Sequence, residues 1–198
     1  MDKTFIIQPE SGLQYDWQAI AADPSAKHNP KMDLVAYKAL YTNRIAQARA
    51  QGLEPVLVSL SIIDENRYFA FITRGMSIQE RKNVLYWLGG HIERLRNIHA
   101  LYNLALFRLA STQCVHIIDI TSPMLASDHY DQLLEQDGIT LSPEGQALVD
   151  DELASLVSRF GLLASSFLLL TLHIFQALHP AGLRFSRFFL FVLFHLSQ

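Results

Sequence analysis

Cysteine is nearly absent from the 198-residue sequence, in which Cys114 stands alone. A single thiol cannot form a disulfide within the chain, and it cannot supply a zinc site built from several cysteines. Because Cys114 opens an apolar segment, residues 114–120, that is typical of a strand, we expect an inert and buried thiol.

An excess of positive charge and a leader sequence are also missing. Lys and Arg number 16 against 19 for Asp and Glu, and the formal net charge of −3 gives no electrostatic reason to bind nucleic acid. The first residues, "MDKTFIIQPES", contain no basic segment followed by a long apolar one, as a secretory signal would. We therefore expect a cytoplasmic protein without a nucleic-acid partner.

Motifs for common cofactors are absent as well. The sequence contains no P-loop, no dinucleotide-binding glycine fingerprint and no G-x-S-x-G elbow. Its eight histidines are scattered, and no two of them lie at metal-ligand spacing with a third ligand nearby. We interpret His99, in a predicted helix, and His116, in a predicted strand, as structural residues. The sequence thus predicts no cofactor and no metal site.

Charge is almost absent from the last part of the chain. Residues 160–198 contain no Asp, Glu or Lys, and residues 160–178 form an uncharged run of 19 residues. A helix of about 20 apolar residues can cross a bilayer. Three interpretations stay open for this tail: a membrane anchor through 160–178, helices packed on the rest of the protein, or the product of a shifted reading frame. We therefore divide the chain into an α/β domain, 1–159, and a hydrophobic tail, 160–198.

The pattern of residues 1–159 indicates strands that alternate with helices. Short apolar runs predict strands at 3–8, 55–63 and 114–120. Helical spacing and capping residues predict helices that begin near Asp33, Ser77, His91 and Ser142. Such alternation is typical of a parallel sheet, whose sites lie in the loops beyond the carboxyl ends of the strands. The loops 9–14, 64–69 and 121–141 are therefore the candidate site regions.

Three aspartates in or near these loops are the acidic candidates. Asp64 could form a local ion pair with Arg67, and Asp119 could accept hydrogen bonds from the backbone of the loop that follows it. Asp137 precedes Gly138, so a turn explains it without any catalytic role. The residues alone leave both a turn and a catalytic role open for Asp137.

Four segments, in order, carry a resemblance to a known family. They are "YDWQAIAADPSAKHNPK", "PVLVSLSIIDENRYFAFITRG", "LGGHIERLRNIHALYNLALFRLASTQCVHIIDITSPML" and "DGITLSPEGQALVDDEL". Together they resemble the SGNH hydrolases, the GDSL-type esterases and lipases, from about Phe5 to Leu156. The resemblance implies a flavodoxin-like, three-layer fold with a parallel sheet, and hydrolysis of acyl esters by a serine that a histidine–aspartate pair activates.

The catalytic positions of the family are only partly present in this chain. The last block keeps Asp137, but Thr140 stands at the position of the histidine. The third block lacks its asparagine in residues 9–14, and the nucleophile block would precede Met1, so the resemblance implies a sheet without the first two strands of the family. A threonine hydroxyl cannot act as a base near neutral pH.

The sequence therefore predicts a degenerate SGNH hydrolase homologue with little or no esterase activity, whose ancestral substrate was a small ester or acylated molecule. A membrane-anchored binding module without enzymatic activity is the alternative. A third hypothesis is an active enzyme in which Ser11 is the nucleophile and His129 the replacement base. Because two strands of the family's sheet are missing, we expect the tail or a second copy of the chain to cover the exposed edge.

Overall fold

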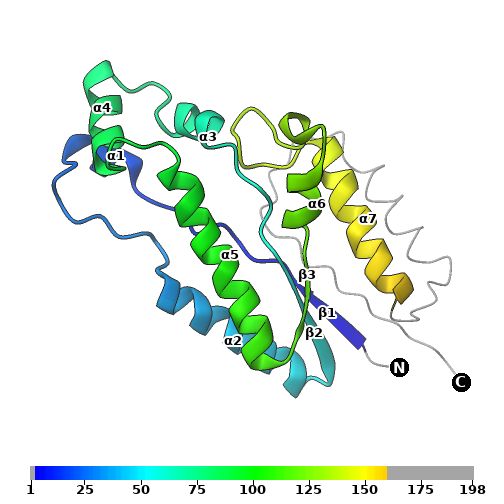
Figure 1. The fold of residues 1–198 in the computed structure, drawn as a ribbon. Helices are drawn as coiled ribbons and strands as arrows, with labels where there is room; N and C mark the ends of the chain where they lie inside the picture. Colours follow the sequence, from blue (N-terminus) through cyan, green and yellow to red (C-terminus); the bar gives the residue numbers. More distant parts are fainter. Residues whose placement is uncertain (1–2, 160–198) are drawn as a thin grey trace, which may run out of the picture.

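The computed structural model describes residues 3–159, which form three strands and the helices that connect them (Figure 1). In chain order the elements are β1 (Lys3–Ile7), α1 (Trp17–Ala22), α2 (Leu34–Ala50), β2 (Leu53–Val58), α3 (Glu65–Ile72), α4 (Ile78–Trp87), α5 (Arg94–Gln113), β3 (His116–Ile118), α6 (Thr121–Ala126), the 3-10 helix η1 (Tyr130–Gln132) and α7 (Pro143–Arg159). The interpretations of the tail at 160–198 lie outside these residues.

The three strands form one parallel sheet in the order β1-β2-β3. Ile6 pairs with Val56, and Val58 pairs with Ile118. The side chains of β2 from Pro55 onward are buried, as the continuous apolar run 55–63 predicts for a strand that is covered on both faces. The α/β class and the parallel sheet expected from the sequence are confirmed.

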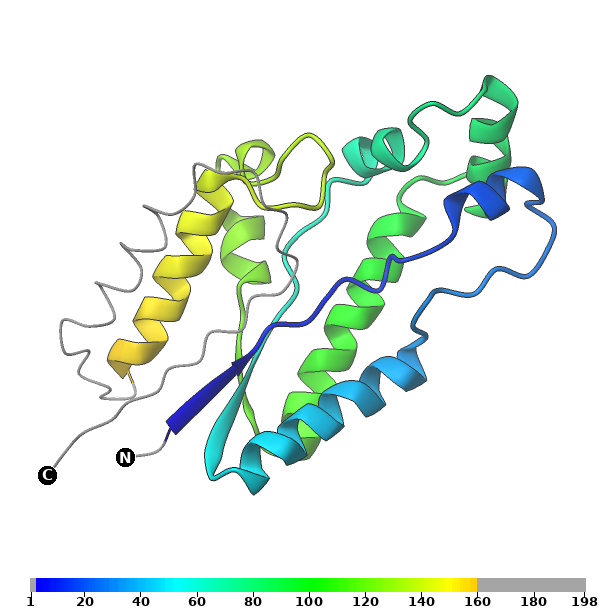
Figure 2. The ribbon, with the colours of Figure 1, turned by 180° about the vertical axis from the view of Figure 1, so that it is seen from behind.

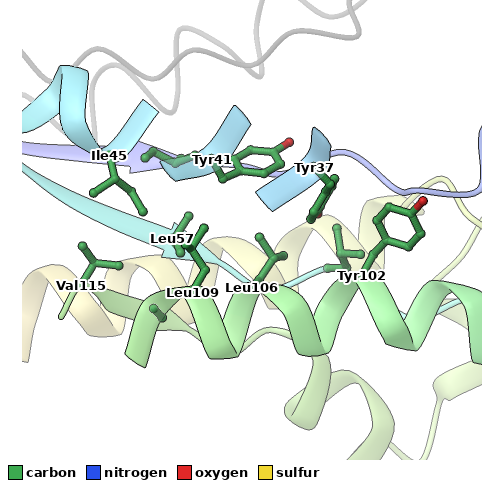
Figure 3. Packing of buried hydrophobic residues seen from close by; sticks show 11 residues of the cluster. Tyr37, Tyr41, Ile45, Leu57, Tyr102, Leu106, Leu109 and Val115 are labelled. Carbon is green, nitrogen blue, oxygen red and sulfur yellow. The ribbon is translucent and has the colours of Figure 1, made fainter. Parts of the chain in front are cut away.

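Helices cover both faces of the sheet. On one face, α2 and α5 pack against β1 and β2 through a cluster that Figure 3 shows from close by: Ile7, Tyr37, Tyr41, Ile45, Leu57, Leu60, Tyr102, Leu106, Leu109, Ala110 and Val115. On the other face, Val149 of α7 packs against Val56, Val58 and Ile118. Figure 2, seen from behind, places α7 on the side of the sheet opposite to α2. The result is the three-layer arrangement of helices, sheet and helix.

Three of the four predicted helices begin directly after a capping residue. Asp33 accepts hydrogen bonds from the backbone N–H groups of Val35 and Ala36 and so caps α2. Ser77 and Glu80 form a reciprocal capping box at the start of α4. Ser142 accepts a hydrogen bond from the N–H of Gly145 and precedes Pro143.

Cys114 is the main local departure from the expectations. It is exposed, and it ends α5 in a left-handed conformation with φ of 48°. The strand that follows has only three residues, His116–Ile118, rather than the predicted 114–120. The prediction of a buried thiol was wrong because helix α5 continues to Gln113, so that residue 114 terminates a helix instead of opening a strand.

None of the helices described within residues 3–159 is both long and apolar enough to cross a membrane. Residues 160–178, on which the membrane interpretation depends, are outside the described range.

Candidate active site

The loops that follow β1 and β2 meet at the carboxyl edge of the sheet, where helix α5 packs against them. Ser11 lies in the loop after β1, and Ser61 lies in the loop after β2. Both loops contact His99, whose side chain is on the buried face of α5 and only 5 % exposed. This histidine therefore joins two loops that are far apart in the sequence.

The hydrogen bonds of His99 define which ring nitrogen carries the proton. Nε2 lies 2.8 Å from the carbonyl oxygen of Ser61, and Nδ1 lies 3.0 Å from Oγ of Ser11. A carbonyl oxygen can only accept, so Nε2 must donate its hydrogen to Ser61. In the neutral ring Nδ1 then has a free lone pair, and it accepts the hydroxyl hydrogen of Ser11.

The imidazole of His99 is held in its neutral form. Burial lowers the pKa of His99 below its ordinary value, and the hydrogen bond to the carbonyl of Ser61 offsets this only in part. A neutral imidazole that already accepts a serine hydroxyl is arranged to take the proton of that hydroxyl. The partner on the far side of the ring is a carbonyl rather than the carboxylate of a catalytic triad, so a positive charge on the ring would be stabilised less.

The backbone around Ser11 is fixed by its neighbours. The N–H of Leu13 donates to Oγ of Ser11 at 3.3 Å, and the hydroxyl of Tyr68 donates to the carbonyl of Leu13 at 3.1 Å. Burial raises the pKa of Tyr68 to about 12, which keeps this hydroxyl protonated. A Cβ atom on Gly12 would collide with the ring of Tyr102, so only glycine fits at this position. The backbone that follows Ser11 is therefore held in place by a hydrogen bond to Leu13 and by packing at Gly12.

The second candidate region, Asp137 and Thr140, is a self-contained turn. Oδ1 of Asp137 accepts the backbone N–H groups of Ile139 and Thr140, and Oδ2 accepts the hydroxyl of Thr140 at 2.6 Å. Partial burial alone would raise the pKa of Asp137, but these hydrogen bonds outweigh it, and the net pKa lies below its ordinary value. Both carboxylate oxygens thus accept hydrogen bonds from the turn itself, as the interpretation of Asp137 as a turn residue requires.

The turn at Asp137 is attached to the start of α3. The N–H of Asp64 donates to the carbonyl of Gly138 at 2.9 Å, while the carboxylate of Asp64 caps α3. Asp64 also forms the predicted ion pair with Arg67 at 3.2 Å. Arg67 in turn donates to the carbonyl groups of Asp131 and Leu134. These contacts connect the loop before α7 to the loop after β2.

Asp119 has the anchoring role that its position predicts. It accepts the backbone N–H of Ser122 at 3.0 Å and the hydroxyl of Ser122 at 2.5 Å, at the start of α6. Sequence reasoning missed the hydrogen-bonded group beside it, in which Ser59, Thr121 and Asn103 join the ends of β2 and β3 to α5. These residues carry no motif: Ser59 is buried just after β2, Thr121 begins α6, and Asn103 lies within α5.

His129, the replacement base of the third hypothesis, is exposed in the loop before η1. Within the described part of the chain, the imidazole that contacts Ser11 belongs to His99 instead. The helical spacing of α5 could have shown that His99 faces the core, because it lies between Leu95 and Tyr102 on the buried side. Nothing in the spacing identifies Ser11 as its partner.

Other features of residues 3–159 do not add a ligand to this region. These residues contain no group of three His, Cys, Asp or Glu side chains arranged to hold a metal ion. A shallow hollow at the start of α5 is lined by Leu88, Gly89, His91, Glu93, Arg94 and Asn97, and it includes none of the candidate site residues.

Comparison with known proteins gives similarity in structure only. No protein-family model matches the chain, and no curated protein matches it. Among solved structures it is similar to a lipase/acylhydrolase from Enterococcus faecalis (17% identity, 69% of this chain and 56% of that chain, TM-score 0.41). It is also similar to a GDSL-like lipase from Bacteroides thetaiotaomicron (11% identity, 78% and 61%, TM-score 0.47). A third is a proposed SGNH hydrolase from Slackia heliotrinireducens (20% identity, 77% and 64%, TM-score 0.47).

The chain spans between 56% and 64% of the length of these three proteins. They bear the names of the GDSL/SGNH lipases and hydrolases, the family that the four segments of the sequence resemble.

Proposed function

We propose that the chain is an SGNH hydrolase homologue in which the family's acyl-ester hydrolysis is impaired. The observation that carries the proposal is the hydrogen bonding of Asp137, whose two carboxylate oxygens accept three bonds from Ile139 and Thr140. In the family pattern this aspartate orients a histidine three residues later, and here that position holds a threonine. The four sequence segments quoted above support the relationship.

The expected loss of activity follows from the chemistry of the missing base. A serine hydroxyl is a weak nucleophile until an imidazole removes its proton. Enzymes accelerate reactions by about 10⁶-fold or more, whereas a serine-hydrolase site that has lost its catalytic residues keeps only about 10³–10⁴-fold over water. Sustained hydrolysis through the Asp137 position is therefore not expected.

The test is steady-state hydrolysis of short-chain aryl esters by the full chain. We expect a rate close to that of buffer, and the same rate for Asp137→Ala. Because the alanine variant also loses the turn, Asp137→Asn serves as the second variant, since an amide oxygen can still accept the two backbone N–H groups. Multiple turnovers that disappear in both variants would refute the proposal.

A further inference from the structure

We infer that Ser11 and His99 form a nucleophile–base pair of their own, through which Ser11 takes up an acyl group from an activated ester. The pair lies between the loop after β1 and helix α5, and it uses neither Asp137 nor Thr140. The inference goes beyond the proposed impairment, which concerns hydrolysis through the Asp137 position.

The first argument is the direction of the hydrogen bonds. The carbonyl of Ser61 holds the proton of His99 on Nε2, so the basic Nδ1 faces Oγ of Ser11 at 3.0 Å. A proton can therefore pass from the serine to the histidine without rotation of the ring. The separation lies within the range of about 2.6–3.2 Å found between a nucleophile and its base.

The second argument is the contrast in exposure within the pair. His99 is buried, whereas Ser11 as a residue is only half-buried. Oγ of Ser11 uses one lone pair to accept the N–H of Leu13 and its hydrogen to donate to His99, which leaves one lone pair for attack. The inference requires that an ester reach this lone pair while the base stays out of water.

The reaction can be written as a balanced exchange. Oγ of Ser11 attacks the carbonyl carbon of an aryl ester, and its hydroxyl proton moves to Nδ1 of His99. The bond from the carbonyl carbon to the aryl oxygen then breaks, and the leaving phenolate takes the proton back from Nδ1. The products are the acyl ester of Ser11 and a free phenol, and His99 returns to its starting state.

The ester must be an activated one, and its acyl group should stay on the serine. Among the residues that the structure describes, Nε2 bonds to the carbonyl of Ser61 and not to a carboxylate, so the imidazolium that forms during attack is stabilised there by a carbonyl dipole. A phenolate or thiolate leaving group needs little help from that acid, whereas the acyl-serine is an alkyl ester with a poor leaving group. We therefore expect one acylation per chain followed by slow hydrolysis.

A purely structural role for His99, as a bridge between the two loops, accounts for the same hydrogen bonds but predicts no special reactivity of Ser11. Ser127 is the matched control. It is also half-buried, and its Oγ also accepts the N–H of the residue two positions on, His129. The two serines differ in one contact that the structure shows: Oγ of Ser11 also lies against the imidazole of His99.

The experiment treats the full chain with p-nitrophenyl acetate and, separately, with a fluorophosphonate. Release of p-nitrophenol is followed for a burst, and intact mass and peptide mapping locate the adduct. We expect up to one equivalent of label on Ser11, loss of the label in Ser11→Ala, and unchanged labelling in Ser127→Ala. His99→Gln should slow the labelling by about 10²-fold or more, the contribution of a general base.

A cysteine variant keeps the test decisive if His99→Gln does not fold. In a Cys114→Ser background, Ser11→Cys should react with iodoacetamide at least about tenfold faster than Ser127→Cys, because a neighbouring histidine favours the thiolate. Equal rates for the two cysteines, or label spread over several serines, would overturn the inference.

The Asp137→Ala chain separates this inference from the proposed function. Unchanged labelling of Ser11 in that chain supports a separate pair, whereas dependence on Asp137 refutes it. Failure to label Ser11 overturns this inference and leaves the proposed impairment standing.

Discussion

Replacement of Gly138 by alanine should destabilise the protein far more than the same replacement at Gly52. Both glycines have a positive φ, 75° and 69° respectively, so alanine at either position costs about 1–2 kcal/mol for the left-handed conformation. A Cβ on Gly52 would meet nothing within 4 Å. The Gly52→Ala variant therefore measures the conformational cost alone.

At Gly138 the added Cβ would also collide with the start of α3. It would lie 2.6 Å from the carbonyl oxygen of Asp64, 2.6 Å from the backbone nitrogen of Tyr68 and 2.8 Å from Cβ of Arg67. Two of these atoms belong to the backbone and cannot move aside as a side chain could. Relief of the collision therefore moves the turn at Gly138 away from the start of α3 and weakens the hydrogen bond from the N–H of Asp64 to the carbonyl of Gly138. Overpacking of this kind costs about 1–3 kcal/mol in addition.

The assay is urea unfolding of the two variants beside the unmodified chain, followed by the fluorescence of Trp17 and Trp87. We expect a loss of about 1 kcal/mol for Gly52→Ala and of about 3 kcal/mol for Gly138→Ala, because only the second adds the collision. In thermal unfolding a difference of 2 kcal/mol corresponds to roughly 4–8 °C in Tm for a chain of this size. Equal losses in the two variants would show that the turn at Asp137 is not packed on α3.

Three further predictions concern the effect on stability of replacing single side chains. Asp33→Ala should lower the free energy of unfolding by about 1 kcal/mol in urea titration, because α2 loses its N-cap. Tyr37→Phe should leave the free energy of unfolding unchanged, since the buried hydroxyl of Tyr37 has no hydrogen-bond partner among the described residues. Tyr41→Phe should lower it by about 1 kcal/mol, because the N–H of Glu10 loses its acceptor. A larger loss for Tyr37→Phe than for Tyr41→Phe in urea unfolding would contradict this. The folded pKa of His99 lies below the unfolded value of about 6.5, so as the pH falls below 6.5 the unfolded state binds a proton that the folded state does not. The free energy of unfolding should then fall by up to about 1.4 kcal/mol per pH unit because of His99, until the pH reaches the folded pKa. His99→Gln should remove this part of the dependence of stability on pH. The same dependence in the variant would count against a buried, neutral ring.

The local features of the fold could be predicted because short-range chemistry determines them. Asp33 and Ser77 indicate helix starts because their side chains can accept hydrogen bonds from backbone N–H groups of the first helical turn, and the structure contains both caps. Asp137 before Gly138 predicts a turn, and the hydrogen bonds of its carboxylate lie within three residues. In such cases donor and acceptor are close in the sequence, so the local residue pattern is enough to predict the hydrogen bond.

The contacts between loops could not be predicted in the same way. Ser11 and His99 are 88 positions apart, and His99 and Ser61 are 38 positions apart. Helical spacing shows that His99 faces the core, and a buried histidine needs hydrogen-bond partners, but the identity of those partners depends on how β1, β2 and α5 pack. Cys114 was mispredicted because an apolar sequence after a helix does not show at which residue the helix ends.

The position of His99 between two loops also has a consequence for the kinetics of folding. Its hydrogen bonds join residues 88 and 38 positions apart and require α5 to be docked beside the loops after β1 and β2, so we expect them to form late in folding. Interactions that are absent from the transition state affect the unfolding rate and leave the folding rate almost unchanged. A chain that lacks this imidazole should therefore reach its native state at the usual speed and lose it sooner.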